Sequence, residues 1–385
     1  MTDVVLFNEI DCENGKKIGV ITLNSPKSLN ALSGAMIDLL YPKLIDWQKQ
    51  QDIAAVFLQG EGEKAFCAGG DIVHLYKAMK SNFNEGEEAS ILAATNNYMP
   101  EIECYFTQEY KLDYLIHTFN KPFVVWGNGI VMGGGLGLLA GASHRVVTEN
   151  SRIAMPEVSI GLFPDVGASY FLNKMPPACG LFLALTGTSI NAADAKYCSL
   201  ADFFVAQEKK DKFLQQLQLV SWEDSKQVNH DLLSRLLQQF EQKSLTLQPV
   251  SQIEAHQVLI TRLIEKDNLI DIVDAISREE THDKWLTRAQ KSLKNGSALS
   301  AQLAYIQLQK GKELSLADCF RMELNLAVKS GCFGEFLEGV RALLIDKDNS
   351  PKWKFDSIAL IDQNIVKWFF QSKWSESEHP LANLD

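Results

Sequence analysis

The chain has 385 residues, of which 46% are hydrophobic and 22% charged, proportions that are ordinary for a folded soluble protein. This length exceeds that of one small domain and indicates a sizeable core with an extension. The formal net charge of −11 argues against general nucleic-acid binding, which needs a cationic face, although a few local lysines could hold a phosphorylated ligand.

Membrane, secretory and metal-binding classes are also disfavoured. No apolar run approaches the ~20 residues that a membrane helix needs, because residues 130–142 are interrupted by glycines. The first ten residues contain no Lys or Arg and resemble neither a signal nor a transit peptide. The seven cysteines form no C-x-x-C pair, which argues against a zinc site or a disulfide framework. We therefore expect a cytoplasmic protein without a metal site or a membrane partner.

The first half of the chain alternates strand-like and helix-like segments. Apolar runs with β-branched residues predict buried strands at residues 18–23, 54–59, 122–126 and 145–148. Between the first two, residues 33–50 carry apolar side chains on one helical face, with Ser33 as the cap. Pro42 is predicted to kink or split this helix. The alternation predicts an α/β core.

From about residue 206 the composition favours helix. Residues 208–219 and 231–243 are rich in Gln, Lys, Leu and Glu. Ser315 and Asp318 resemble a capping box, and Gly331 is predicted to end the helix that they begin. We therefore predict a core at residues 1–205, a mainly helical region at 206–373 and a polar, disordered tail at 374–385.

A glycine-rich segment at residues 127–137 follows a predicted strand and leads into a helix-like stretch. The glycines, among them Gly133 and Gly134, let backbone N–H groups approach a ligand closely. Unpaired N–H groups at a helix start could stabilise an oxyanion or bind a phosphate. The segment alone is equally compatible with a tight turn that needs small residues for packing.

The same glycines nearly match a dinucleotide-binding fingerprint. Gly127, Gly129 and Gly133 are spaced G-x-G-x-x-x-G, and Glu149 lies about 20 residues on, where a ribose-binding acid is expected. The position in mid-chain and the additional glycines argue against this interpretation. A nicotinamide-dependent oxidoreductase therefore remains a remote alternative.

A second glycine turn, residues 66–71, also follows a predicted strand and precedes a helix. Asp71 is expected to cap that helix. One N–H group from each glycine turn could converge on one oxygen atom, which is the geometry of a two-donor oxyanion hole. Without the first turn, a plain glycine turn with an Asp cap would be the preferred interpretation.

Glu157 and Asp165 are the only acids in the apolar stretch 155–167. Apolar surroundings disfavour the charged form of a carboxyl group, so the pKa of each should rise toward a range useful for acid–base chemistry. The alternative is that one acid caps a helix and the other is exposed.

Four segments resemble the crotonase (enoyl-CoA hydratase/isomerase) superfamily and occur in that family's order: residues 23–32, 65–71, 132–135 and 156–165. Residues 335–342 also resemble the family's closing helix, so the similarity spans most of the chain. The resemblance implies a crotonase-type ββα spiral core with a mainly helical C-terminal region. It also implies an acyl-CoA substrate, no cofactor beyond the CoA of that substrate, and assembly into a homo-oligomer.

Within the superfamily, the sequence is most similar to the 3-hydroxyisobutyryl-CoA hydrolase family. Asp165 stands where hydratases have Gly, Gly137 stands where they have a second catalytic Glu, and residues 106–110 and 339–353 resemble signatures of the hydrolases. The resemblance implies hydrolysis of a short 3-hydroxyacyl-CoA thioester in valine catabolism. Hydration or isomerisation of an enoyl-CoA is the alternative, and Gly137 and Asp165 argue against it.

The resemblance also assigns roles. The N–H groups of Ala68 and Gly134 would form the oxyanion hole, and Glu157 would be the principal catalytic carboxylate, acting as nucleophile or as general base. Asp165 would bind the 3-hydroxyl group or assist proton transfer, and Glu109 would lie at the acyl pocket. The further substrate-binding residues would be Gly69, Gly70, Asp71 and Gly133. Apart from the resemblance, Lys27 in the 23–32 segment is a candidate for the CoA phosphates, although a surface lysine is usually only solvated. The chain departs from the hydrolases at Ala168, where a third glycine is common, and at Asn128, where a His often stands.

Overall fold

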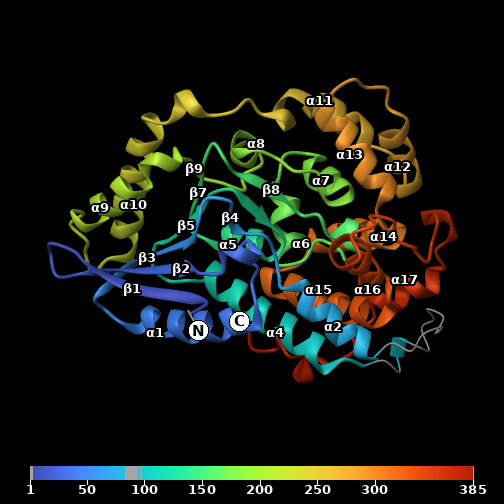
Figure 1. The fold of residues 1–385 in the computed structure, drawn as a ribbon, viewed down its shortest axis with the longest axis horizontal. Coiled ribbons are helices and arrows are strands. Elements are labelled where there is room, and N and C mark those ends of the chain that lie inside the picture. The colour runs from blue at the N-terminus through green and yellow to red at the C-terminus, as the bar shows by residue number, and fades with distance from the viewer. Residues whose placement is uncertain (1–2, 83–93, 96–97, 385) are drawn as a thin grey trace. The chain divides into compact units, whose positions relative to one another are not determined.

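A computed structural model describes residues 3–82, 94–95 and 98–384 (Figure 1). The chain divides into two compact units. Unit 1 comprises Met1–Gly70, Leu112–Ile153 and Ile190–Ala255, and unit 2 comprises Asp71–Lys111, Ala154–Ser189 and His256–Asp385. Neither unit ends at residue 205, where the composition indicated a boundary, because the chain passes between the units several times.

Unit 1 is built on two sheets, a six-stranded one in the order β1-β2-β3-β5-β7-β9 and a three-stranded one in the order β4-β6-β8. Only the β1–β2 pair of the large sheet is antiparallel. From β3 onward successive strands alternate between the sheets, as the predicted spiral requires. The strands are β1 (Val5–Asp11), β2 (Lys17–Leu23), β3 (Ile53–Gly60), β4 (Ala65–Cys67), β5 (Phe123–Gly127), β6 (Ile130–Met132), β7 (His144–Val147), β8 (Arg152–Ala154) and β9 (Phe203–Phe204).

The helices of unit 1 cover both faces of the large sheet (Figure 1). Ile18 and Val20 point into an apolar cluster with Phe213 of α9 and Leu237 of α10. Gly19 faces the other way, where the Trp47 ring of α1 leaves no room for a side chain. The helices are α1 (Gly34–Lys49), α5 (Gly134–Gly141), α8 (Ala192–Tyr197), α9 (Lys210–Gln218) and α10 (Lys226–Gln242).

The four predicted strands are confirmed as β2, β3, β5 and β7, and Ser33 caps α1 by accepting a hydrogen bond from the Met36 N–H group. The predicted split at Pro42 is wrong, because α1 runs through it as one helix. Pro42 lies on the exposed face, as does Asp38, whose carbonyl group lacks the proline N–H partner. Water can satisfy that carbonyl group, so the helix tolerates the proline.

Unit 2 is helical. Its helices are α2 (Ile72–Asn82), α6 (Ala168–Phe171), α7 (Cys179–Thr186), α12 (Leu269–Arg278), α13 (Lys284–Asn295), α14 (Ala298–Gly311), α15 (Leu316–Phe333), α16 (Glu335–Val340) and α17 (Gln363–Phe370), while α4 (Pro100–His117) and α11 (Gln252–Ile264) contain residues of both units. A π-helical turn, Arg341–Ile345, follows α16. The predicted helical character of the C-terminal region is confirmed.

Two details of unit 2 correct the sequence predictions. Gly331 does not end α15. A Cβ atom there would lie 2.9 Å from the Ile102 side chain, so a glycine at this position allows close packing of the helix. The helix ends instead at Gly334, whose φ of 99° is left-handed. Residues 374–384 are also not disordered, because the Leu381 side chain is buried and the Arg321 guanidinium donates to the Leu381 carbonyl group.

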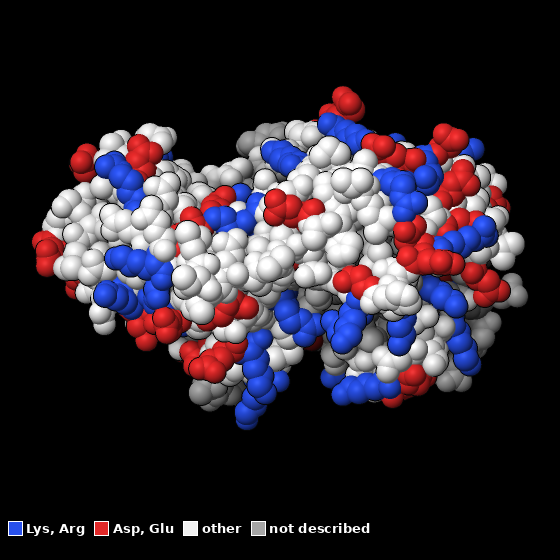
Figure 2. Space-filling model, turned by 90° about the horizontal axis from the view of Figure 1, so that it is seen from above, with Lys and Arg blue, Asp and Glu red and all other residues white. Residues whose placement is uncertain are grey.

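The surface carries both signs of charge. On the face drawn in Figure 2, acidic and basic side chains are interspersed and neither sign covers a broad area. Among the described residues, no helix is long and apolar enough to cross a membrane, and no group of three or more His, Cys, Asp and Glu side chains could hold a metal ion. The seven cysteines are free thiols, and all except Cys104 are buried.

Candidate active site

Two glycine-rich turns lie side by side in unit 1. The first, residues 68–70, follows β4, and the second, residues 133–135, follows β6. Because β4 and β6 pair in parallel, both turns leave the same edge of the small sheet. A Cβ atom at Gly135 would lie 2.2 Å from the Cys67 carbonyl oxygen, so only glycine permits this approach.

The amide groups of these turns differ in what they bind. The Ala68 N–H group donates to the Leu29 carbonyl oxygen at 3.1 Å, so it is already engaged and does not suit the oxyanion role assigned to it. Gly134 opens α5, where the first N–H groups have no acceptor within the helix. Within the described part of the chain, the turn and loop hydrogen bonds include none donated by the Gly70 N–H group. Gly70 and Gly134 are therefore the better candidate pair of donors.

The other predicted substrate-binding residues of these turns have local structural roles. Gly69 and Gly133 have φ values of 113° and 49°, a backbone conformation that residues other than glycine rarely adopt. The Asp71 carboxylate accepts a hydrogen bond from the His74 N–H group at 3.2 Å, which confirms it as the cap of α2.

A cavity of about 410 Å³ in unit 1 lies at the start of β4, and its lining residues include Lys27 and Lys64 together with Glu61 and Glu63. The Asn30 side chain fixes its walls by donating to the Glu61 and Ala65 carbonyl groups, both at 3.0 Å. Two ammonium groups suit the phosphates of an anionic ligand. Lys27 lines this cavity and stays a predicted phosphate ligand, and Lys64 is a second candidate that was missed because a single lysine before a strand forms no pattern.

Three acids predicted from the sequence are buried in unit 2. Glu109 lies on α4, Glu157 begins the 3₁₀ helix Glu157–Ile160, and Asp165 lies in the loop before α6. Their exposed fractions are 2%, 4% and 4%. The Glu157 Oε2 atom has no hydrogen-bond partner within residues 3–82, 94–95 and 98–384. A buried carboxyl oxygen without a protein partner is available to a substrate or to water.

Burial dominates the titration of these acids, as the apolar sequence around Glu157 and Asp165 predicted for those two. It raises the pKa of Glu157 well above the usual range, and the charges of Asp165 and Glu109 raise it further. Burial and the Asp165 charge likewise raise the pKa of Glu109. Burial raises the pKa of Asp165 to about 7, against an opposing hydrogen bond from Tyr110. The electrostatic coupling identifies the three acids as one cluster.

A family model described as enoyl-CoA hydratase/isomerase matches residues 18–370. The chain belongs to this family. A carnitinyl-CoA dehydratase from Mycobacterium thermoresistibile has the same crotonase fold, with a TM-score of 0.80 and 29% identity over 96% of this chain and 97% of that one. An enoyl-CoA hydratase from Rhodobacter sphaeroides matches with a TM-score of 0.78 and 28% identity over 95% and 97% of the two chains.

Curated relatives of this crotonase-family chain are named as hydrolases. The mitochondrial 3-hydroxyisobutyryl-CoA hydrolase of Danio rerio is 36% identical over 95% of this chain and 90% of the relative. The Dictyostelium discoideum protein of the same name is 34% identical over 99% and 93%. The Arabidopsis thaliana 3-hydroxyisobutyryl-CoA hydrolase 1 is 32% identical over 97% and 94%.

The dinucleotide alternative has no support in the crotonase fold. Glu149, the proposed ribose-binding acid, accepts a hydrogen bond from the Gln207 N–H group at 3.0 Å. Asn128, where a His often stands in the hydrolases, donates to the Glu63 carbonyl group and accepts from the Thr148 hydroxyl group. Both residues thus tie loops of unit 1 together.

Two residues of the acidic cluster were missed from the sequence. The Tyr110 hydroxyl group donates to Asp165 Oδ2 at 2.8 Å, and burial raises the pKa of Tyr110, so the hydroxyl keeps its proton. Glu323, on α15, accepts hydrogen bonds from two backbone N–H groups just after Asp165. A tyrosine inside an aromatic run and a glutamate inside a helix are too common for their sequence positions to reveal these contacts.

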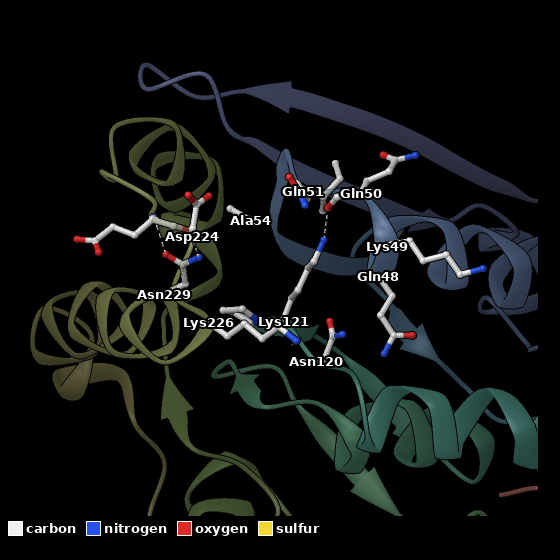
Figure 3. A pocket seen from close by; sticks show the side chains of 13 residues that line it. Gln48, Lys49, Gln50, Gln51, Ala54, Asn120, Lys121, Asp224, Lys226 and Asn229 are labelled. Atoms are coloured by element: carbon white, nitrogen blue, oxygen red, sulfur yellow. Dashed lines mark hydrogen bonds between the residues drawn. The ribbon is translucent and has the colours of Figure 1, made fainter. Parts of the chain in front are cut away.

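A second cavity of unit 1, of about 360 Å³, contains none of the predicted site residues (Figure 3). Burial lowers the pKa of Lys121, which lines it, to about 8. The Lys121 ammonium group donates to the Trp47 and Gln50 carbonyl groups at the end of α1. Lys121 is therefore a helix-capping residue, for which a cation at a helix C-terminus is suited.

Proposed function

We propose that this chain hydrolyses the thioester bond of 3-hydroxyisobutyryl-CoA and releases 3-hydroxyisobutyrate and CoA. Support comes from the curated hydrolases that match it over at least 90% of both lengths, such as those of Danio rerio and Dictyostelium discoideum. Within the site, the observation that carries the proposal is the buried Glu157 carboxyl group, whose Oε2 atom has no hydrogen-bond partner among the described residues.

In this proposal the thioester carbonyl oxygen accepts hydrogen bonds from the Gly70 and Gly134 N–H groups. Negative charge develops on that oxygen when the carbonyl carbon is attacked, and fixed donors stabilise it. Removing one such donor typically costs about 2.7–4 kcal/mol of barrier. Backbone donors held by a paired strand and a helix start need no rearrangement during the reaction.

Glu157 is proposed to supply the carboxylate for the attack. It either adds to the carbonyl carbon, so that CoA leaves as the thiol and water opens the resulting anhydride, or it removes a proton from an attacking water. Asp165 and Glu109 are proposed to bind the acyl part of the substrate, with Asp165 contacting the 3-hydroxyl group. Gly137 leaves the chain without the second glutamate of a hydratase, so hydration of an enoyl-CoA is the less suited reaction.

The remaining features are proposed on narrower grounds. We place the enzyme in the breakdown of valine, on the strength of its proposed substrate. Seven free thiols favour a reducing compartment such as the cytoplasm, whereas several relatives are named mitochondrial. Assembly into a homo-oligomer is an expectation from the superfamily.

The test is to incubate the protein with 3-hydroxyisobutyryl-CoA, 3-hydroxypropionyl-CoA, crotonyl-CoA and NAD, following thiol release, enoyl absorbance and NADH. We expect thiol release from the 3-hydroxyacyl substrates alone. Glu157→Gln should lose at least roughly 100-fold in kcat while its affinity for CoA stays nearly unchanged, because only the reacting carboxylate is altered.

Loss of enoyl absorbance without thiol release would replace hydrolysis by hydration, and near-normal hydrolysis by Glu157→Gln would remove Glu157 from its role. Single-turnover hydrolysis in ¹⁸O-water then tests for an anhydride that water opens at the Glu157 carboxyl carbon. Label in the Glu157 carboxylate supports that anhydride, whereas label in the product alone is expected from the general base and from an anhydride opened at the acyl carbon.

A further inference from the structure

The loop that carries Asp165 is a strained tight turn. The Ala168 N–H group donates to the Asp165 carbonyl oxygen at 2.9 Å, which closes a β-turn over Val166 and Gly167. Both central residues have positive φ, 53° and 88°. Glycine adopts this conformation freely, but a β-branched residue such as Val166 does so only under constraint from its surroundings.

That constraint comes from two neighbouring helices. Glu323 of α15 accepts hydrogen bonds from the Gly167 N–H group at 2.7 Å and the Ser169 N–H group at 2.8 Å, one on each carboxyl oxygen. On the other side of Asp165, Gln307 of α14 donates to the Pro164 carbonyl group. Glu323 and Gln307 are fully buried, so water does not compete for these contacts.

We propose that Glu323 is a positioning residue, which holds the strained turn so that Asp165 faces the substrate. The inference rests on the proposed hydrolase function and deepens it, since it assigns the orientation of Asp165 to a residue 158 positions away in sequence that itself touches no substrate. Glu323 acts on the backbone of the turn, whereas Tyr110 acts on the Asp165 carboxylate itself. Backbone and side chain are thus fixed by different elements.

The chemistry of the contact requires a carboxyl group. Each of its two oxygens accepts one N–H group, whereas the amide of glutamine offers a single accepting oxygen and a donating NH₂ group. Glu323→Gln would therefore leave the NH₂ group facing the Gly167 or the Ser169 N–H group. One anchor of the turn would be lost while the size and burial of the side chain stay the same.

We expect Glu323→Gln to lower kcat for 3-hydroxyisobutyryl-CoA by roughly 10- to 100-fold, because a displacement of about 1 Å at a reacting centre has such effects. KM should change less than threefold, since neither Glu323 nor the turn that it holds is among the residues proposed to bind CoA. Asp194→Asn is the matched control. The buried Asp194 carboxylate of unit 1 also accepts two backbone N–H groups, from Asn191 and Ile253, but touches no predicted site residue, so its kcat should stay within twofold.

A double mutant tests whether Glu323 acts through Asp165. If it does, Asp165→Asn combined with Glu323→Gln should be no slower than Asp165→Asn alone, because the group being positioned is already gone. Losses that multiply would overturn the proposal, as would unchanged kcat in Glu323→Gln. Should Glu323→Gln fail to fold, Glu323→Asp keeps the carboxyl group but is one methylene too short to reach both amides, and the same criteria apply to it.

Hydrogen exchange gives a readout that does not need activity. Peptides covering residues 165–169 should exchange faster in Glu323→Gln than in the wild type, and those of the Asp194→Asn protein should not. Unchanged exchange in this segment would show that Glu323 does not fix the turn and would overturn the proposal. If the wild type releases no thiol, the hydrolase proposal fails separately, while the exchange result still decides whether Glu323 fixes the turn.

Discussion

At Glu157, the burial that sets its titration also bears on the catalytic role that we propose for it. A carboxylate attacks or removes a proton only when ionised. Burial raises the pKa of Glu157 well above the usual range, and the Asp165 charge adds to the rise. Activity should therefore be lost as the pH falls through this raised value, above the ordinary glutamate pKa of about 4.3.

The profile of kcat/KM against pH measures this acid limb. In Asp165→Asn, one of the charges that raise the pKa of Glu157 is absent, so the limb of the residual activity should move to lower pH. A limb near the pKa of a free glutamate, and unmoved in the variant, would show that Glu157 is not the group whose ionisation controls the rate.

At the scale of elements, the start of α5 depends on how closely it approaches β4. A Cβ atom at Gly135 would lie 2.2 Å from the Cys67 carbonyl oxygen, so backbone must move to admit it. We expect Gly135→Ala to destabilise the fold by about 1–3 kcal/mol, as overpacking does, and to lower kcat by displacing the Gly134 N–H group.

Gly34→Ala is the control for this prediction. Gly34 is the first residue of α1, and a Cβ atom there would meet no atom within 4 Å. Its stability should be unchanged or higher, because alanine favours helix. Urea unfolding of the two variants makes the comparison, and an equal effect of both would refute the steric argument.

The elements that the sequence predicted well are those whose own residues decide them. The apolar runs of β2, β3, β5 and β7 and the Ser33 and Ser315 caps carry their signal locally. The end of α15 was not predictable from local residues, because Gly331 is explained by its contact with Ile102, more than 200 positions earlier. The order of the C-terminal tail likewise depends on Arg321, a distant partner.

The residues of the candidate site likewise divide into those that local sequence predicts and those that it does not. The buried acids Glu157 and Asp165 were predictable because apolar neighbours surround them in sequence. The choice of Gly70 over Ala68 was not, since it depends on the Leu29 carbonyl group that already holds the Ala68 amide. Glu323 was not predictable either, because its partners lie on another element.

For the whole molecule, a cluster of buried acids should make folding more favourable at low pH. Burial raises the pKa of Asp165 to about 7 in the folded protein, whereas an unfolded aspartate titrates near 3.9. Between these values the folded state holds a proton that the unfolded state has released. The contribution of Asp165 to stability is therefore present below about pH 4 and is lost as the pH rises to about 7.

Asp165→Asn, which cannot titrate, removes this effect together with the part of the Glu157 and Glu109 pKa shifts that the Asp165 charge causes. Its free energy of unfolding relative to the wild type should rise with pH between about 4 and 7, by about 1.4 kcal/mol per pH unit for each proton that the two proteins bind differently. Buried His144, whose pKa burial lowers to about 4, titrates over part of the same range with the opposite sign, but it is present in both proteins and cancels in the difference. Urea unfolding of both proteins at several pH values gives the difference directly. A difference that stays constant with pH would mean that Asp165 remains ionised in the fold, and the substrate contact proposed for it would then be that of a charged acceptor throughout.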